Sequence, residues 1–323
     1  MSNTGSTWAI VLAAGDGNRL RSLTTDPTGV AVPKQFCSLQ GGASLMHETL
    51  DRALSITDPE HVVTIVADTH RRWWRPMTAA LPGRNVIAQP RNRGTGNGIL
   101  LPLLHIVNRD PDARIVILPS DHYIRRESVL RGSLRRAVRE LERYERELVL
   151  LGISPEEPDP ELGYIQPASG DGRGFHSVER FVEKPDLAVA RELLTRGGMW
   201  NSFIIASRAQ ALLDIYATRF PEVVMAMVGA LQVDAEGWAS GGTRDLYDDL
   251  PDIDFSRHVI TGFESRLRML AVPPCGWSDL GTPERVARTL TRLPRAARAT
   301  NSKFFMPAYL DLATAQLRVQ AQA

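Results

Sequence analysis

Short, continuously apolar runs alternate with longer segments of helical periodicity through the first half of the chain. Strands buried on both faces read as unbroken runs of Val, Ile and Leu, whereas strands with one wet face alternate apolar and polar residues. The pattern therefore predicts an α/β fold with a mostly parallel sheet covered by helices on both faces. The predicted strands are 8–13, 61–67, 85–89, 114–118 and 148–153, and the predicted helices are 44–55, 70–80, 95–107 and 127–147.

The pattern changes after residue 153. Segment 154–160 contains three prolines and can continue neither a helix nor a central strand. We therefore predict one domain over 1–293, with a first half at 1–153, a second half at 154–293, and a helical tail at 294–323 whose pattern centres on 308–320. In the second half we expect strands 163–167, 176–183, 199–206 and 266–272, and helices 187–196, 207–218, 221–232 and 283–293.

Charge and composition exclude several classes of protein. The net charge of +1 provides no broad basic surface for a nucleic acid, and 43% hydrophobic residues suit a globular core. Two cysteines, Cys37 and Cys275, form neither a disulfide framework nor a zinc cluster. No apolar run reaches the ~18–20 residues of a membrane helix, and the N-terminus lacks the basic region of a signal peptide. We expect a cytoplasmic protein without membrane or nucleic-acid partners.

The first predicted strand runs directly into the glycine-rich segment GDGNRL at 15–20. Glycines at such a turn let backbone N–H groups approach phosphates closely. The dinucleotide-binding fingerprint fails because Leu20 stands where its third glycine belongs, and the P-loop fails because the chain has no Gly-Lys pair. Two interpretations remain: a phosphate-binding loop ending in Arg19, and an ordinary strand–helix turn.

Only three of the 38 basic residues are lysines: Lys34, Lys184 and Lys303. Lys34 lies in the motif PKQF beside the glycine-rich segment, and Lys184 lies in EKP at the end of a predicted strand. An ammonium fits between phosphate oxygens as a point charge, whereas a planar guanidinium needs room for its fork. Lys34 and Lys184 are therefore candidate phosphate ligands, with surface lysines as the alternative, and Lys303 is assigned to the surface.

Two aspartates follow predicted strands and are candidate ligands for Mg²⁺. Asp121, in LPSDH, comes just after strand 114–118, at the edge where open α/β sheets bind ligands, and Asp279 lies in WSDLG. Mg²⁺ takes few protein ligands and shares phosphates and water. The alternatives are a helix cap for Asp121 and a turn former for Asp279, while His122 is expected to be a packing neighbour. Segment 91–98, RNRGTGNG, could close around a flat base or simply begin a helix.

In order along the chain, eight motifs resemble those of the sugar-1-phosphate nucleotidyltransferases, the sugar-nucleotide pyrophosphorylases, and especially the mannose-1-phosphate guanylyltransferase branch. The resemblance spans about residues 8–281. It implies a Rossmann-like mixed, mostly parallel sheet flanked by helices, with a sugar-binding insertion and no β-helix domain. The motifs are LAAGDGNRL, PKQF, PRNRGTG, LPSDH, GISPEEPDPELGYI, FVEKPD, MWNSF and WSDLG.

The resemblance also implies an activity, its substrates and its residues. The expected reaction joins a nucleoside triphosphate, most simply GTP, to a hexose 1-phosphate such as mannose-1-phosphate. The expected cofactor is Mg²⁺, and the expected assembly is a homodimer. By resemblance the catalytic residues are Arg19, Lys34 and Lys184, and the metal ligands are Asp121 and Asp279. Nucleotide contacts would come from Ala14, Gly15, Gly17, Gln89, Asn92, Gly94 and Thr95, and sugar-phosphate contacts from Gly163, Glu183, Lys184 and Asn201.

The chain departs from the family pattern at positions that bear on specificity. RNRGTG replaces the usual RNTAPA, a short insertion precedes Pro33, and Phe203 stands where the family has glycine. Two alternatives therefore stay open: a glucose-1-phosphate nucleotidyltransferase that uses UTP or dTTP, and a non-catalytic homologue that binds nucleotide sugars.

Overall fold

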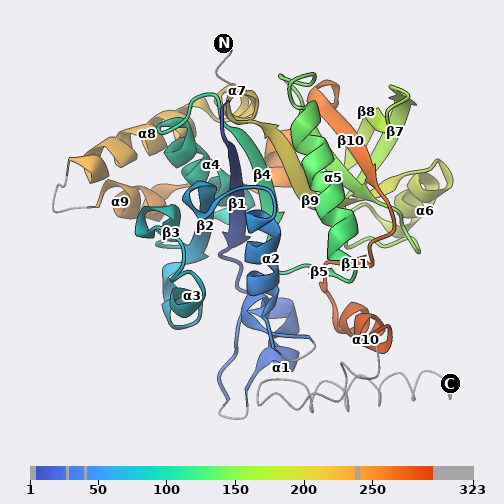
Figure 1. Ribbon diagram of the computed structural model, residues 1–323, viewed down its shortest axis with the longest axis horizontal. Coiled ribbons are helices and arrows are strands. Elements are labelled where there is room, and N and C mark those ends of the chain that lie inside the picture. Colours follow the sequence, from blue (N-terminus) through green and yellow to red (C-terminus); the bar gives the residue numbers. More distant parts are fainter. Residues whose placement is uncertain (1–4, 27–28, 40–41, 237–240, 294–323) are drawn as a thin grey trace.

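The computed structural model describes residues 5–26, 29–39, 42–236 and 241–293 (Figure 1). Within these ranges a nine-stranded sheet has the order β3-β2-β1-β4-β9-β6-β10-β8-β7. The strands are β1 Thr7–Ala13, β2 Val62–Ala67, β3 Val86–Gln89, β4 Arg114–Pro119, β6 Leu148–Ile153, β7 Tyr164–Gly170, β8 Phe175–Val182, β9 Met199–Arg208 and β10 Leu267–Val272. The predicted tail helix near 308–320 lies outside the described residues.

The sheet is mixed, as predicted. Strands β3, β2, β1 and β4 pair in parallel, and so do β6 and β10. Of these nine strands, β9 and β8 run against the other seven, because each pairs antiparallel with its neighbours. Strands from both predicted halves interleave, since β9 lies between β4 and β6. The division of the chain at residue 153 stays a prediction.

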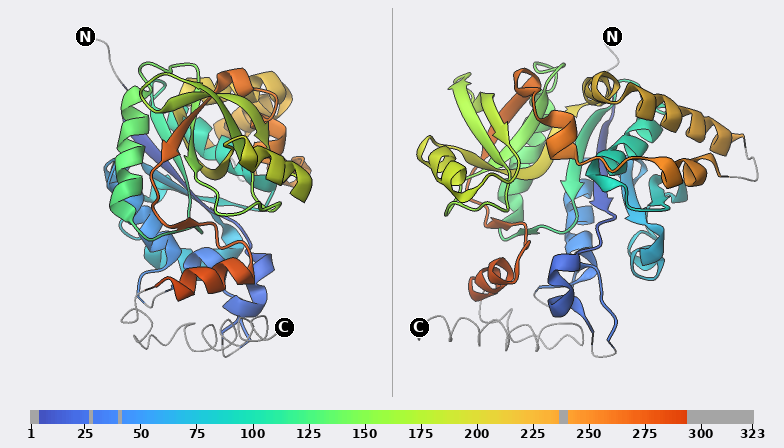
Figure 2. Two further views of the ribbon diagram at one scale, coloured as in Figure 1. Left: turned by 90° about the vertical axis from the view of Figure 1, so that its right-hand side faces the viewer. Right: turned by 180° about the vertical axis from the view of Figure 1, so that it is seen from behind.

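Helices cover both faces of the sheet, because every central strand is apolar on both sides. Alternate residues of β1 enter opposite cores, Ala9 and Val11 on one face and Trp8 and Ile10 on the other. The first core is closed by α2 Leu45–Leu54, α3 Arg71–Met77, α5 Glu127–Glu140 and α6 Leu187–Thr195, and the second by α4 Gly94–Val107, α7 Ala209–Arg219 and α8 Pro221–Ala235. Figure 2 shows β7 and β8 at one side of the molecule and α8 with α9, Gly242–Asp249, at the other.

The helix predicted over 127–147 ends at Glu140. The apolar periodicity continues because Leu141 and Tyr144 stay buried in the same core after the helix stops. Tyr144 then donates its hydroxyl hydrogen to Asp171 Oδ2 at 2.5 Å. The burial of Leu141 and Tyr144 in the same core therefore extended the helical spacing of apolar residues past the end of the helix, and the sequence pattern overestimated its length.

Short elements complete the fold around one edge of the sheet, and most of them are absent from our sequence-based assignment. The helices are α1 Arg21–Thr24 and α10 Pro283–Thr291, of which α10 was predicted as 283–293, and a π-helical turn runs over Phe255–Ile260. Strands β5 Tyr123–Ile124 and β11 Trp277–Ser278 form a separate two-stranded sheet. Leu20, just before α1, and Leu290 on α10 belong to a third small core, against which Leu23 of α1 also packs. Figure 1 shows both helices at the same end of the molecule, although they lie far apart in sequence.

Candidate active site

A cavity of about 320 Å³ opens at the carboxyl ends of the parallel strands. This is the edge at which open α/β sheets place their ligands. Its lining includes every site residue proposed from the sequence except Lys34, which lines an adjoining cavity of about 330 Å³ together with Asp121. The residues so assembled are Ala14, Gly15, Gly17, Arg19, Gln89, Asn92, Gly94, Thr95, Asp121, Gly163, Glu183, Lys184, Asn201 and Asp279.

The glycine-rich loop has a fixed course between β1 and the first helical turn. Gly17 has φ 64°, and a Cβ there would lie 3.0 Å from the backbone N of Lys34, so glycine is required at that position. Gln35 is buried, and its Nε2 donates to the carbonyl oxygens of Ala13 at 3.0 Å and Gly15 at 2.9 Å. Gln35 therefore fixes the backbone at the start of the glycine-rich loop, a role that was not predicted from the sequence.

Arg19 reaches from this loop to the opposite rim. Its Nη1 donates to Glu161 Oε2 at 2.8 Å, and both side chains are about half exposed. Such an exposed pair contributes little to stability. A phosphate could therefore exchange with Glu161 for the guanidinium at low cost.

Lys34 lies next to Gly17 of the loop and is only 8% exposed. Its Nζ lies 2.9 Å from Oδ2 of Asp121 and donates to the carbonyl oxygen of Asp279 at 2.7 Å. Burial opposes ionisation of the Asp121 carboxyl, but the charge and the hydrogen bond of Lys34 prevail and lower its pKa. Asp121 is therefore an anion at neutral pH, held in place by a buried cation.

Strands β5 and β11 bring the two candidate metal ligands together. Tyr123 pairs with Ser278, and Asp121 and Asp279, which flank this pair of strands, both line the main cavity. His122 accepts a hydrogen bond from Trp277 Nε1 at 3.3 Å, and the two rings meet edge to face at 5.3 Å. Burial lowers the pKa of His122, which favours the neutral ring.

Both carboxylates already have a cationic neighbour. Asp279 Oδ1 accepts from Arg285 Nη1 at 2.5 Å, as Asp121 accepts from Lys34. In the described part of the chain no three His, Cys, Asp or Glu residues are grouped to hold a metal ion. Two carboxylates nevertheless fit Mg²⁺ in kind, because this ion completes its shell with phosphate and water oxygens.

Close packing accounts for two glycines in the turn that follows β3. A Cβ on Gly94 would lie 2.3 Å from the carbonyl oxygen of Ile253, and one on Gly96 would lie 2.3 Å from Ile253 Cγ2. Gly96 N–H also donates to that carbonyl oxygen at 2.7 Å. These glycines are therefore required by the approach of the 251–255 segment, and the turn also begins helix α4.

Gln89, at the end of β3, presents an unused acceptor to the cavity. The residue is only 2% exposed, and its Oε1 has no hydrogen-bond partner among the described residues. A buried polar atom without a partner costs free energy unless a ligand supplies one. The N–H groups on the edge of a guanine or uracil base are suitable donors.

The far end of the cavity combines acidic and amide side chains. Burial raises the pKa of Glu183, the nearby Asp254 carboxylate adds to the rise, and Lys184 opposes it. A Cβ on Gly163 would lie 2.6 Å from Glu183 Oε2, while Asn201 N–H donates to the Gly163 carbonyl oxygen at 2.8 Å. Hydroxyl-rich ligands are bound by such groups, which offer donors and acceptors side by side.

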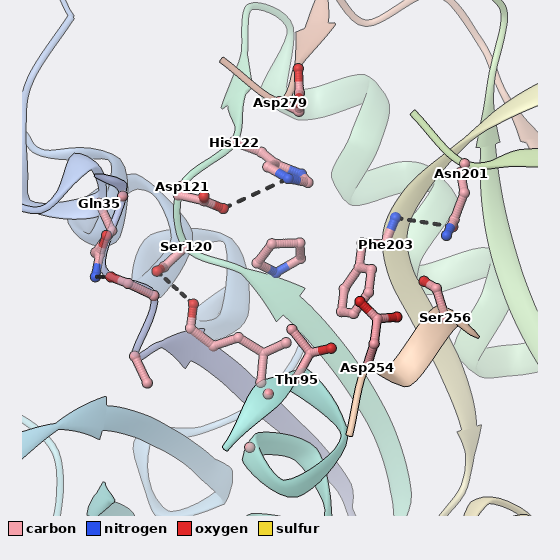
Figure 3. Close-up of a pocket in the computed structure, with 18 of the residues that line it drawn as sticks. Gln35, Thr95, Ser120, Asp121, His122, Asn201, Phe203, Asp254, Ser256 and Asp279 are labelled. Atoms are coloured by element: carbon pink, nitrogen blue, oxygen red, sulfur yellow. Dashed lines mark hydrogen bonds and ion pairs between the residues drawn. The ribbon is translucent and has the colours of Figure 1, made fainter. Parts of the chain in front are cut away.

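Three residues other than glycine have a positive φ in the described part of the chain: Lys184 at 50°, Phe203 at 57° and Leu280 at 50°. Lys184 and Phe203 line the main cavity, and Leu280 lines the adjoining one. Strained backbone of this kind persists where the surroundings enforce it, and it concentrates at functional sites. Figure 3 shows Phe203 and Asp254 facing the cavity, and neither was among the site residues proposed from the sequence.

Comparison with known proteins identifies the family of the chain. The family model described as nucleotidyl transferase matches residues 8–293. Xanthan biosynthesis protein XanB of Xanthomonas campestris pv. campestris is 30% identical over 291 residues, covering 84% of this chain and 57% of XanB. Mannose-1-phosphate guanylyltransferase of Salmonella muenchen is 28% identical with the same coverages. The chain thus spans little more than half the length of these curated relatives.

A solved structure is also similar. The crystal structure titled mannose-1-phosphate geranyltransferase, from Thermus thermophilus, has a TM-score of 0.74 and 26% sequence identity, covering 89% of this chain and 80% of that one. No helix in the described residues is long and apolar enough to cross a membrane. The family match over 8–293, with its glycine-rich loop and paired carboxylates at one sheet edge, shows that the chain belongs to the nucleotidyl transferase family.

Proposed function

We propose that the chain is a sugar-1-phosphate nucleotidyltransferase that joins GTP to mannose-1-phosphate and releases pyrophosphate. The observation that carries the proposal is the cavity in which a glycine-rich loop, two carboxylates and Lys184 converge, with Lys34 directly beside it. The name of the relative from Salmonella, mannose-1-phosphate guanylyltransferase, supports the choice of substrates. The strands β3-β2-β1-β4 would act as a Rossmann-like nucleotide-binding unit.

The proposed chemistry needs no dedicated general base. A sugar phosphate is already largely a dianion at neutral pH, because its second pKa is ~6. It can attack the α-phosphorus in line, with pyrophosphate as the leaving group, once the two reactants are held in position. Arg19 and Lys34 would bind the triphosphate, and Lys184 would bind the sugar phosphate.

Asp121 and Asp279 would hold Mg²⁺ in this scheme. The bound ion would supply charge neutralisation for the phosphates. Lys34 fixes the position of Asp121, and Arg285 fixes that of Asp279. The protein's own contribution is thus to orient two anionic oxygens toward the place where phosphate charge collects.

Base and sugar are assigned to opposite ends of the cavity. Gln89 would accept a hydrogen bond from guanine, with Asn92 and Thr95 nearby, and Ala14, Gly15 and Gly17 would follow the ribose and phosphates. Gly163, Glu183 and Asn201 would meet the sugar hydroxyls. We further propose a cytoplasmic enzyme, with a homodimer as an expectation for sedimentation analysis.

Two other functions would use the same cavity. UTP or dTTP with glucose-1-phosphate is favoured by Phe203 and by the turn at 92–96, which differ from the guanylyltransferase pattern. A non-catalytic nucleotide-sugar-binding homologue is disfavoured because Arg19, Lys34 and Asp121 are all retained and grouped.

A substrate panel separates these three functions. Purified protein is mixed with Mg²⁺, each of GTP, UTP, dTTP, ATP and CTP, and either mannose-1-phosphate or glucose-1-phosphate, and pyrophosphate release is followed. The proposal expects the GTP and mannose-1-phosphate pair to be fastest. A faster rate with UTP or dTTP and glucose-1-phosphate selects the second function, and binding without release across the panel selects the third.

A further inference from the structure

Strand β9 carries an irregularity at the wall of the cavity. Its pairing with β6 runs from Leu150 with Ile205 to Gly152 with Asn201, so residues 202–204 bulge opposite the single residue Leu151. A bulge of this kind bends a strand and turns a side chain to a new direction. The side chain turned in this way is that of Phe203, which lines the cavity.

Hydrogen bonds hold the bulge in one shape. The buried hydroxyl of Ser202 donates to the Leu151 carbonyl oxygen at 2.6 Å and accepts from Ile204 N–H at 3.2 Å. Phe203 N–H donates to Asn201 Oδ1 at 3.1 Å. The Phe203 backbone is thus hydrogen-bonded to Asn201, which is assigned to the sugar. A change in the Phe203 backbone conformation would break this hydrogen bond or move the Asn201 side chain.

The ring of Phe203 is supported from behind. It packs against Phe255 at 5.8 Å between centroids, and Phe255, which is fully buried, packs against Tyr216 at 6.2 Å. Tyr216 in turn donates its hydroxyl hydrogen to the Gly96 carbonyl oxygen at 2.7 Å. This row of rings ends on helix α4, so the Phe203 ring is backed by packed residues on the side away from the cavity.

A phenylalanine at this position has an energetic cost. A left-handed conformation is unfavourable for a residue with a β-carbon, whereas glycine adopts it freely. The bulge would therefore form more readily with glycine at 203. Strain that is retained in the wall of a binding cavity points to a use for the side chain.

The ring also has a defined chemical setting. Figure 3 shows Phe203 beside Asp254 and Ser256, with Asn201 on the same strand, so an apolar plane stands among hydrogen-bonding groups. Pyranose rings present a C–H face between their hydroxyls, and a flat aromatic surface is complementary to that face. The same ring occupies volume at the cavity wall that a smaller residue would leave open.

We propose that Phe203 determines sugar specificity by restricting the site to unsubstituted hexose 1-phosphates and excluding those that carry an N-acyl group. The inference rests on the proposed function, because it assigns this end of the cavity to the sugar. It predicts that Phe203 acts on the sugar phosphate and leaves the nucleotide unaffected. A merely structural role would alter both substrates together.

The test compares wild type, Phe203→Gly and Phe203→Tyr with mannose-1-phosphate and its 2-acetamido counterpart. Wild type should prefer the unsubstituted sugar in kcat/KM, and Phe203→Gly should reduce that preference at least about tenfold, the range that pocket shape commonly supplies. The change should lie in the KM of the sugar phosphate, with the KM of GTP constant. Phe203→Tyr keeps a ring and should keep the preference.

Phe263→Ala is the matched control, since Phe263 is a partly buried phenylalanine outside the cavity that packs against the second core. It should leave the preference at the wild-type value. If Phe203→Gly does not fold, as judged by its thermal melt, Phe203→Leu replaces it with a smaller expected change. An unchanged preference in a folded variant overturns the inference while leaving the proposed function intact.

Calorimetric titration of the two sugar phosphates separates the two ideas. If wild type binds sugar phosphate but releases no pyrophosphate with any pair, the proposed function fails. The ratio of the two binding constants in wild type and Phe203→Gly then decides the inference. Equal ratios contradict it, and a ratio reduced about tenfold supports it.

Discussion

The ammonium of Lys34 lies 2.9 Å from the carboxylate of Asp121 and donates a hydrogen bond to the backbone oxygen of Asp279. One buried side chain thus joins three segments that are far apart in sequence: the motif after the glycine-rich loop, the end of β4 and the strand β11. A lysine suits this place because a compact cation reaches both oxygens without the room that a guanidinium fork needs.

Replacement of Lys34 should be far more harmful to activity than its single charge suggests. Lys34→Met removes a candidate phosphate ligand and leaves Asp121 without its cation, so kcat/KM for pyrophosphate release should fall at least about a hundredfold. Lys34→Arg should not restore it, because the buried position is too tight. Arg84→Met is the control. It breaks one exposed ion pair with Glu60 away from the cavity and should leave kcat/KM unchanged. Wild-type rates in Lys34→Arg would contradict the assignment.

The two aspartates should share a single requirement for magnesium. Asp121→Asn and Asp279→Asn should each raise the Mg²⁺ concentration needed for half-maximal rate and lower the maximal rate about a hundredfold, because each removes an anionic oxygen ligand. The measurement is the initial rate against MgCl₂ concentration. Asp112→Asn changes an exposed aspartate elsewhere and serves as control. An unchanged Mg²⁺ dependence in both site variants would remove the metal assignment.

Gln89 should contribute to recognition of the base. Its buried Oε1 is without a hydrogen-bond partner among the described residues. A base that donates to it therefore forms a hydrogen bond without displacing one within the protein. Gln89→Leu should raise the KM for GTP about tenfold and leave the KM for mannose-1-phosphate unchanged. Thermal shift with GTP alone gives a second readout. Equal effects on both substrates would indicate a packing defect instead of base recognition.

Stability should depend on pH through Glu48 on helix α2. Burial raises its pKa from 4.5 to about 7, with Glu127 and Asp51 adding to the rise and Arg52 opposing it. Because the folded-state pKa is the higher one, the protonated form stabilises the fold below pH 4.5, and this contribution is lost as the pH rises through about 7.

The variant Glu48→Gln keeps a neutral side chain at every pH. Its melting temperature should exceed that of wild type at pH 8 and match it near pH 4.5, as measured by calorimetry in buffers of constant ionic strength. The activity at a permissive temperature should be unchanged, since Glu48 lies outside the cavity. A variant that is less stable than wild type at pH 8 would show that the charged form is favoured.

Much of the fold could be predicted because the central strands bury both faces. The unbroken apolar runs of β1 and β4 predicted the strands, and the glycine and lysine motifs predicted a site at their carboxyl ends, where the main cavity lies. The antiparallel insertion of β9 between β4 and β6 follows from long-range pairing, which a local pattern does not encode.

The parts of the site that escaped prediction depend on contacts between distant segments. For segment 91–98 the sequence leaves two alternatives, closure around a base and an ordinary helix start. The small size of Gly94 and Gly96 is explained by Ile253, which comes from a segment more than a hundred residues away. The π-helical turn that follows Asp254 has no periodic signature, and the bulge at Phe203 appears only in the register of β6 against β9.

The most direct test of the account is product formation by the wild-type protein with Mg²⁺, GTP and mannose-1-phosphate, resolved by anion-exchange chromatography. The account predicts GDP-mannose and pyrophosphate in equal amounts, at a rate that requires both substrates. Release of phosphate and GDP without a nucleotide sugar, or no consumption of GTP, would contradict it.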